Sequence, residues 1–161
     1  NFTSLIIAGE LETKGDSNDP VVFTSFIDDE YGGDLNGNAT TTAPTPGDWT
    51  QIRLADTSSS TISNTIFRYG GRYDGSGKTL LRVDSATSTI KDSIFEYSKD
   101  CGLELLNSNS LVENNIFRNN NDSSTSIGLY AQSSNAIISG NSFINNKAGN
   151  SPSGKNNYYL K

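Results

Sequence analysis

The chain contains the stretch Thr61-Ile-Ser-Asn-Thr-Ile-Phe-Arg-Tyr69, and three later stretches align with it without gaps. They are Thr89-Ile-Lys-Asp-Ser-Ile-Phe-Glu-Tyr97, Leu111-Val-Glu-Asn-Asn-Ile-Phe-Arg-Asn119 and Ile137-Ile-Ser-Gly-Asn-Ser-Phe-Ile-Asn145. Each has an apolar residue at its second position, Asn, Asp or Gly at its fourth and Phe at its seventh. Successive Phe residues are 28, 22 and 26 residues apart. A repeat of this length indicates a solenoid, in which similar units stack.

A second apolar segment precedes each of the four stretches at a nearly constant distance. These segments are Gln51-Ile-Arg-Leu54, Leu80-Leu-Arg-Val83, Gly102-Leu-Glu-Leu105 and Gly128-Leu-Tyr-Ala131. From the inner apolar residue of each segment to the following Phe, the separation is 15 residues once and 14 residues three times. Both kinds of segment alternate apolar and polar residues, which predicts short strands with one buried face.

The fourth position of the repeat predicts a sharp bend between two strands. Asn, Asp and Gly, which occupy it, are the residues that best tolerate the left-handed backbone conformation. A unit of two or three short strands cannot bury its own apolar face, so successive units must stack in parallel about 4.8 Å apart. The sequence therefore predicts an all-β parallel β-helix of about five coils. Its interior would contain one stack of Ile62, Ile90, Val112 and Ile138 and another of Phe67, Phe95, Phe117 and Phe143.

The rest of the chain fits one β-helix domain over residues 1–161. Residues 5–9, 10–13 and 20–25 predict the strands of an earlier coil, and residues 158–160 predict the first strand of a further one. Between the strands we expect an acidic insertion rich in Gly, Thr and Pro at about 26–48 and a shorter loop at 70–78. Because solenoids need capped ends, we expect the chain to be a module of a longer protein or to stack on a neighbour.

Composition excludes several classes of function. Asn, Ser, Thr and Gly make up 72 of the 161 residues and hydrophobic residues only 33%, which argues against a helical bundle. The net charge of −6 without a basic cluster argues against a nucleic-acid partner, and the lack of a long apolar run argues against membrane insertion. The chain has no His, the commonest general base, and its single Cys101 excludes an internal disulfide.

Several motifs carry a family resemblance. Gly9-Glu-Leu-Glu-Thr-Lys-Gly15, Pro20-Val-Val-Phe-Thr-Ser25, Asp28-Asp29, Gly32-Gly33-Asp34 and Pro46-Gly-Asp-Trp49 resemble the opening of right-handed, pectate-lyase-like β-helix modules. Those modules belong to large secreted bacterial surface proteins, so the resemblance implies a right-handed helix and an extracellular or cell-surface location. Because this fold hosts lyases, hydrolases, adhesins and inert spacers, it does not decide the activity.

The insertion contains a candidate calcium site. Asp34, Asn36 and Asn38 supply oxygen atoms at alternate positions around a glycine, and Asp28 or Asp29 could complete the shell. Calcium is bound by six to eight oxygens, commonly from such a loop. The loop departs from the EF-hand pattern because Gly37 comes one place early and no Glu closes it. The alternative is a solvated acidic turn.

The outward row beside the first strand of each coil contains Arg53, Arg82, Glu104 and Tyr130. The resemblance implies that an enzyme of this fold would place its catalytic groups on such a row, which makes Arg53, Arg82 and Glu104 the catalytic candidates. The row can also be a charge ladder with Arg82 over Glu104, like those we expect for Lys91 over Glu113 and for Arg68, Glu96 and Arg118. Exposed pairs of this kind contribute about 0.2–1 kcal/mol each.

Tyr69, Tyr97 and Tyr130 are candidates for a sugar-binding surface. The function that the sequence favours is nevertheless a non-catalytic structural or adhesive module, such as a stalk, filament or adhesin, which could self-associate end to end or bind a glycan. The alternatives are a polysaccharide lyase or glycoside hydrolase acting on an acidic glycan, and a carbohydrate-binding module. Calcium is the one cofactor that the sequence suggests.

Overall fold

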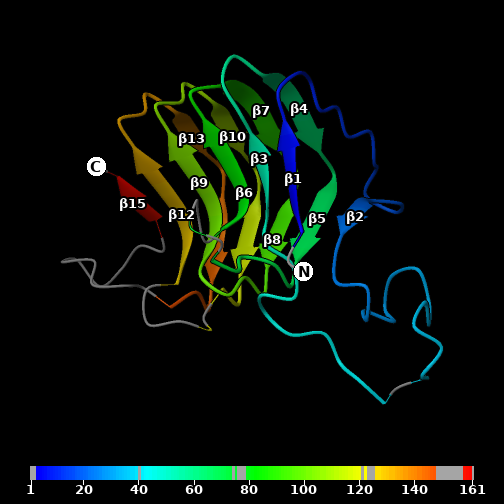
Figure 1. The fold of residues 1–161 in the computed structure, drawn as a ribbon. Coiled ribbons are helices and arrows are strands. Elements are labelled where there is room, and N and C mark those ends of the chain that lie inside the picture. Colours follow the sequence, from blue (N-terminus) through cyan, green and yellow to red (C-terminus); the bar gives the residue numbers. More distant parts are fainter. Residues whose placement is uncertain are drawn as a thin grey trace.

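The computed structural model describes residues 3–39, 41–73, 75, 79–120, 122, 126–147 and 158–160. Within them the secondary structure is strand alone, in three parallel sheets (Figure 1). Sheet A contains β1 (Ser4–Ile7), β3 (Gln51–Leu54), β6 (Thr79–Asp84), β9 (Cys101–Leu106), β12 (Ile127–Gln132) and β15 (Tyr158–Leu160). Sheet B contains β4 (Ser59–Ser63), β7 (Thr87–Lys91), β10 (Leu111–Glu113) and β13 (Ile137–Ser139). Sheet C contains β2 (Val21–Phe23), β5 (Thr65–Arg68), β8 (Ile94–Glu96), β11 (Ile116–Arg118) and β14 (Ser142–Ile144).

The chain passes through sheets A, B and C in turn, and this confirms the predicted parallel β-helix. Among the described residues, four successive coils contribute a strand to every sheet, from β3–β5 to β12–β14. An earlier coil contains β1, a single bridge from Glu12 to Thr61 and β2. As predicted, β15 continues sheet A beyond β12. The complete coils are thus four, slightly fewer than the predicted five.

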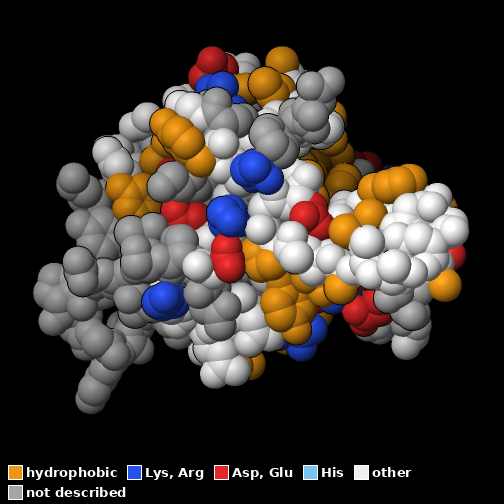
Figure 2. Space-filling view, turned by 60° about the horizontal axis from the view of Figure 1, so that its bottom comes forward, with side chains coloured by type: hydrophobic (Ala, Val, Ile, Leu, Met, Phe, Trp, Pro, Cys, Tyr) orange, Lys and Arg blue, Asp and Glu red, His pale blue; other side chains and the backbone are white. Residues whose placement is uncertain are grey.

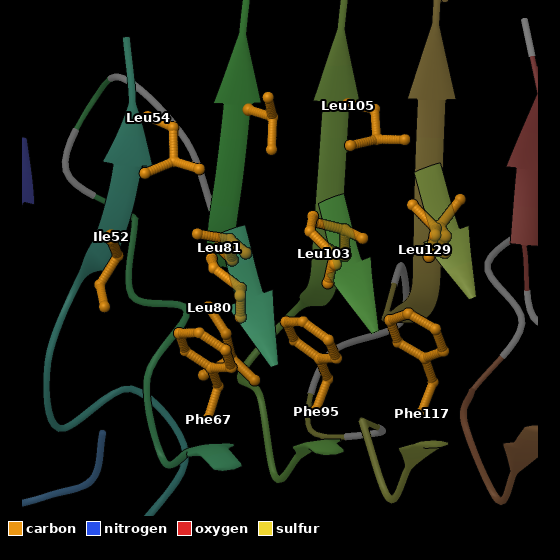
Figure 3. Close-up of a cluster of buried hydrophobic side chains, with 14 of the residues drawn as sticks. Ile52, Leu54, Phe67, Leu80, Leu81, Phe95, Leu103, Leu105, Phe117 and Leu129 are labelled. Carbon is orange, nitrogen blue, oxygen red and sulfur yellow. The ribbon is translucent and has the colours of Figure 1, made fainter. Parts of the chain in front are cut away.

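The register of the strands confirms both interior stacks. Ile62, Ile90, Val112 and Ile138 pair in order across sheet B, and Phe67, Phe95, Phe117 and Phe143 across sheet C. The centroids of adjacent rings in this Phe series are 4.9 Å apart. Figure 3 shows Phe67, Phe95 and Phe117 side by side in one row, facing the row of Leu81, Leu103 and Leu129 of sheet A. Such aligned rings contribute burial and a further 0.5–1.5 kcal/mol or so per pair.

The predicted bends have the left-handed conformation. Asn64, Asp92, Asn114 and Gly140 have φ values of +46°, +50°, +55° and +66°. Two further rows of left-handed residues, which were not predicted, close the other corners of the coil. One row is Thr57, Ser85, Asn107 and Ser133, and the other is Tyr69, Tyr97, Asn119 and Asn145.

Ladders of buried polar side chains line two corners. The Asn115 side chain accepts a hydrogen bond from the backbone N–H of Ser93 (3.0 Å) and donates to the carbonyl of Ile90 (2.9 Å). Equivalent pairs of bonds come from Asn120, Asn141 and Asn146. These bonds satisfy turn groups that would each cost about 1–3 kcal/mol if they were buried without a partner.

The insertion at 26–48 joins β2 to β3 without a strand in its described residues, and it projects from the corner between sheets C and A (Figure 1). In the shorter loop at 70–78, residues 74 and 76–78 lie outside the described residues.

Candidate functional site

The predicted outward row lies on sheet A in the expected register. Arg53 pairs with Arg82, Arg82 with Glu104 and Glu104 with Tyr130, one coil after another. Because side chains alternate along a strand, these four leave the sheet on the face opposite the leucine core. The catalytic candidates Arg53, Arg82 and Glu104 are therefore neighbours.

A chain of ion pairs joins the first three members of this row. Arg53 Nη2 lies 2.7 Å from Asp84 Oδ2, and Arg82 Nη2 lies 3.3 Å from the same oxygen. Arg82 Nη1 lies 3.4 Å from Glu104 Oε2. Asp84 was not among the predicted residues, although alternation from Arg82 along β6 places it on the same face. We call Arg53, Arg82, Asp84 and Glu104 the sheet A ion-pair chain.

The pKa of the Glu104 carboxyl is raised from its ordinary value of 4.5. Burial is the largest cause, and the charges of Asp84 and Asp100 add to it, whereas Arg82 opposes it. Asp100, which lies just before β9 and is itself 8% exposed, is a second acidic group that the sequence analysis missed. A raised pKa is one property that a general acid needs, but the ion pair with Arg82 favours the charged carboxylate.

Basic and acidic side chains alternate near the middle of the face in Figure 2, and no broad patch of one sign is visible there.

Tyr130, the fourth member of the row, donates a hydrogen bond from its hydroxyl to Gln132 Oε1 (2.5 Å). The charged pair predicted outside this row, Lys91 and Glu113, lies in the predicted register on sheet B, where β7 pairs with β10.

The three tyrosine candidates lie in two places. Tyr69 and Tyr97 are at the corner between sheets C and A, with their rings stacked 5.2 Å apart, whereas Tyr130 is on the outer face of sheet A. The Arg68 guanidinium lies 4.6 Å from the Tyr69 ring centroid and 5.6 Å from that of Tyr97. Burial is the main cause that raises the pKa of Tyr69. Because a sugar stacks on an open ring face, the mutual stacking of these two rings reduces the surface available to one.

Arg68 is the centre of a buried ionic cluster, which we call the Arg68 cluster. Its Nε lies 3.2 Å from Glu96 Oε1 and 3.6 Å from Asp28 Oδ2, and its Nη1 lies 2.8 Å from Glu30 Oε2. Arg118 Nε binds the other Glu96 oxygen at 2.6 Å. The side chains of Arg68, Glu96 and Asp28 are only 5%, 3% and 3% exposed.

The ladder of Arg68, Glu96 and Arg118 has the predicted register, but the expectation that it lies in solvent is wrong for Arg68 and Glu96. Asp28 and Glu30 of the insertion bind Arg68 from outside, and the ring of Tyr31 lies 5.1 Å from its guanidinium. Burial alone would lower the pKa of Arg68, but the bond to Glu30 and the charge of Glu96 raise it above its ordinary value. Arg68 therefore stays a cation that anchors the insertion.

The calcium candidates are divided between two parts of the insertion. Asp28 accepts a hydrogen bond from Thr24 and contacts Arg68, and it is 3% exposed. Asp34 accepts hydrogen bonds from the backbone N–H groups of Asn38 (3.0 Å) and Ala39 (2.8 Å). Across the described residues, His, Cys, Asp and Glu form no group of three or more that could hold a metal ion.

The candidate calcium ligands that remain close together are Asp34, Asn36 and Asn38. Among these three, only Asp34 has a carboxylate. Asp29, the remaining candidate, is only partly exposed. A tight calcium site needs more carboxylate ligands than this, so the arrangement suits weak binding at most. Calcium binding remains a prediction.

Cys101 is buried at the start of β9, and its thiol donates a hydrogen bond to the carbonyl of Leu103. Burial, together with the charges of Glu104 and Asp100, raises its pKa well above the ordinary value. Since the thiolate is the nucleophilic form, burial and the raised pKa favour a structural role for Cys101.

Residues 27–161 match the family model described as "Right handed beta helix region". The chain belongs to the right-handed β-helix family. The match covers most of the sequence and agrees with the three parallel sheets, so the handedness that the resemblance implied holds for this β-helix. Comparisons with curated proteins and with solved structures found no match. Among its described residues, this right-handed β-helix contains no helix long and apolar enough to cross a membrane.

Proposed function

We propose that this right-handed β-helix is a non-catalytic structural or adhesive module of an extracellular or cell-surface protein. The observation that carries the proposal is the sheet A ion-pair chain. On the face where the family resemblance places catalytic groups, Arg53 and Arg82 bind Asp84, and Arg82 also binds Glu104. Side chains whose charges neutralise one another between coils leave less charge for a substrate.

The proposed mechanism is mechanical. Parallel strands form hydrogen bonds along the helix axis, aligned Phe rings fill the interior, and Asn ladders hold the corners. Each kind of contact joins one coil to the next. Sheets, rings and ladders therefore all resist a force that would pull the coils apart along the axis. This construction suits a stalk, a filament segment or a scaffold that displays a binding surface.

An activity screen tests the proposal. The protein would be incubated with uronic and neutral polysaccharides, while unsaturated products and new reducing ends are measured. We expect no turnover by the wild-type chain. The matched variants are Arg82→Ala, on the outer face of sheet A, and Arg118→Ala, on that of sheet C. Turnover that Arg82→Ala abolishes and Arg118→Ala retains would refute the structural function.

The second candidate function is a lyase or hydrolase acting on an acidic glycan, and the raised pKa of Glu104 favours it. In that reaction Glu104 would donate a proton to the glycosidic oxygen, and Arg53 and Arg82 would bind the uronic carboxylate. A hydrolase also needs a second carboxylate, for which Asp84 is the nearest candidate because Arg82 contacts both acids. Turnover lost in Glu104→Gln would establish this function, whereas glycan retention without turnover would indicate a carbohydrate-binding module.

A further inference from the structure

The insertion contains Asn36-Gly37, the one Asn-Gly dipeptide of the sequence. In most dipeptides the side chain of the second residue hinders attack of its backbone nitrogen on the preceding Asn amide. Glycine has no side chain, so that obstacle is missing here. Gly37 is exposed and has a φ of +68°. A Cβ atom placed on Gly37 would have no other atom within 4 Å, so the space around this residue is open. Both solvent and the neighbouring side chain therefore have access to this peptide group.

The Asn36 side chain folds back along its own backbone. Its Oδ1 accepts a hydrogen bond from the N–H of Asn38 (3.2 Å), which also donates to Asp34 Oδ1 (3.0 Å). This is an Asx turn, in which the side-chain carbonyl lies over the following peptide unit. Because both atoms belong to the ring that this hydrogen bond closes, we expect Asn36 Cγ to lie near the Gly37 nitrogen. The N–H of Asn38 is also placed to stabilise negative charge that develops on Oδ1 during an attack at Cγ.

We propose that Asn36 is a site of spontaneous deamidation. The Gly37 nitrogen loses its proton to solvent and attacks Asn36 Cγ, forming the new N–C bond of a succinimide ring. The Cγ–Nδ2 bond breaks, and the amide leaves as ammonia with a proton from solvent. Water then opens the ring at one of its two carbonyls and gives either Asp or isoaspartate at position 36. No oxidation or reduction takes place.

The chain supplies internal controls in the coils. Asn107 and Asn109 are each followed by Ser, the next most permissive kind of neighbour in this sequence after Gly. The backbone N–H of Asn107 donates to Gln132 of the next coil (3.0 Å), and the Asn109 side chain accepts a bond from Asn135 (3.3 Å). These contacts between coils oppose the backbone rotation that ring closure needs. Folding should therefore protect Asn107 and Asn109, while it leaves Asn36 reactive.

Deamidation would change the insertion locally. Asn36 Nδ2 donates to Thr42 Oγ1 (3.4 Å), and the product has no nitrogen to make this bond. The new carboxylate would lie beside Asp34 and lower the net charge by one from −6. The isoaspartate product also has one more atom in its main chain, which alters the turn.

The test follows the purified protein in mildly alkaline buffer at physiological temperature, in parallel with the same protein kept unfolded in urea. Peptide mapping by mass spectrometry and enzymatic isoaspartate methylation measure modification at each Asn. We expect Asn36 to react at least as fast in the folded as in the unfolded protein, and Asn107 and Asn109 to react more slowly when folded. Folding that slows Asn36 as much as Asn107 would overturn the proposal.

Two variants separate the chemistry from the loop's conformation. Asn36→Gln keeps an amide but requires a larger ring, so position 36 should stay unmodified. Gly37→Ala restores a side chain at the attacking residue and should slow the reaction in both folded and unfolded protein. If Gly37→Ala leaves the unfolded rate unchanged, attack by this nitrogen is refuted whatever the variant does to the folded loop.

Discussion

Replacing Arg68 by Ala should destabilise the β-helix far more than the same change at Arg118, although both belong to one ladder. Arg68→Ala leaves Asp28 without a cation and Glu96 with the half-exposed Arg118 alone, and both carboxylate side chains are 3% exposed. Removing one member of a buried ion pair costs about 3–5 kcal/mol. Arg118 is 42% exposed, and without it Glu96 still contacts Arg68 at 3.2 Å, so its loss should cost about 0.2–1 kcal/mol.

Urea denaturation of the two variants measures this difference. With a slope of about 2 kcal/mol per molar urea, the midpoint should fall by about 2 M in Arg68→Ala and by less than about 0.5 M in Arg118→Ala. Limited proteolysis provides a second measurement, because Arg68 also binds Asp28 and Glu30 of the insertion. Cleavage within 26–48 should accelerate in Arg68→Ala alone. Equal midpoint shifts, or unchanged cleavage in Arg68→Ala, would refute the anchoring function of the Arg68 cluster.

Three further outcomes are expected. Asn120→Ala should lower the free energy of unfolding by about 2–4 kcal/mol, because Ser98 N–H and the Phe95 carbonyl each lose a partner. Asn120→Ser keeps an acceptor, so thermal and urea melts should show a smaller decrease in its free energy of unfolding. Because the folded-state pKa of Glu104 is raised above its ordinary value of 4.5, its contribution to stability is fully present below that pH and is lost as pH rises through the folded-state pKa. The stability of Glu104→Gln relative to wild type should therefore increase from acidic to neutral pH, and a constant difference between the two would contradict this. Calcium should raise the melting temperature only at about millimolar concentration and not in Asp34→Ala, so micromolar binding would contradict the donor set.

The repeating part of the molecule could be predicted from sequence because one set of residues satisfies several requirements at once. Phe95 and Phe117, for example, must be buried, must follow a bend and must lie above one another, and each requirement has a signal in the repeat. The Asn ladders could have been predicted in the same way. Ser98 and Asn120 lie at one repeat position, and a small polar residue at a buried corner indicates a bond to the backbone.

The part of the site that depends on the insertion could not be predicted in the same way. Residues 26–48 occur once, so no alignment between coils shows which coil they contact. Asp28 and Glu30 were visible as acidic residues, but their binding to Arg68 depends on how the insertion folds back on sheet C. Asp100 was missed for a related reason, since it lies in a corner whose path differs between coils and reaches Glu104 only in three dimensions.

The Asn ladders give the rod a polarity. The backbone groups belong to the earlier coil and the Asn side chain to the following one. The side chain accepts from an N–H, as from Ser93 to Asn115, and donates to a carbonyl, as from Asn115 to Ile90. At these corners, a cut between two coils would therefore leave backbone N–H and carbonyl groups without partners on the N-terminal piece and unpaired Asn amides on the C-terminal piece. The two ends of a broken rod would therefore differ chemically at these corners, because one exposes backbone groups and the other exposes side-chain amides.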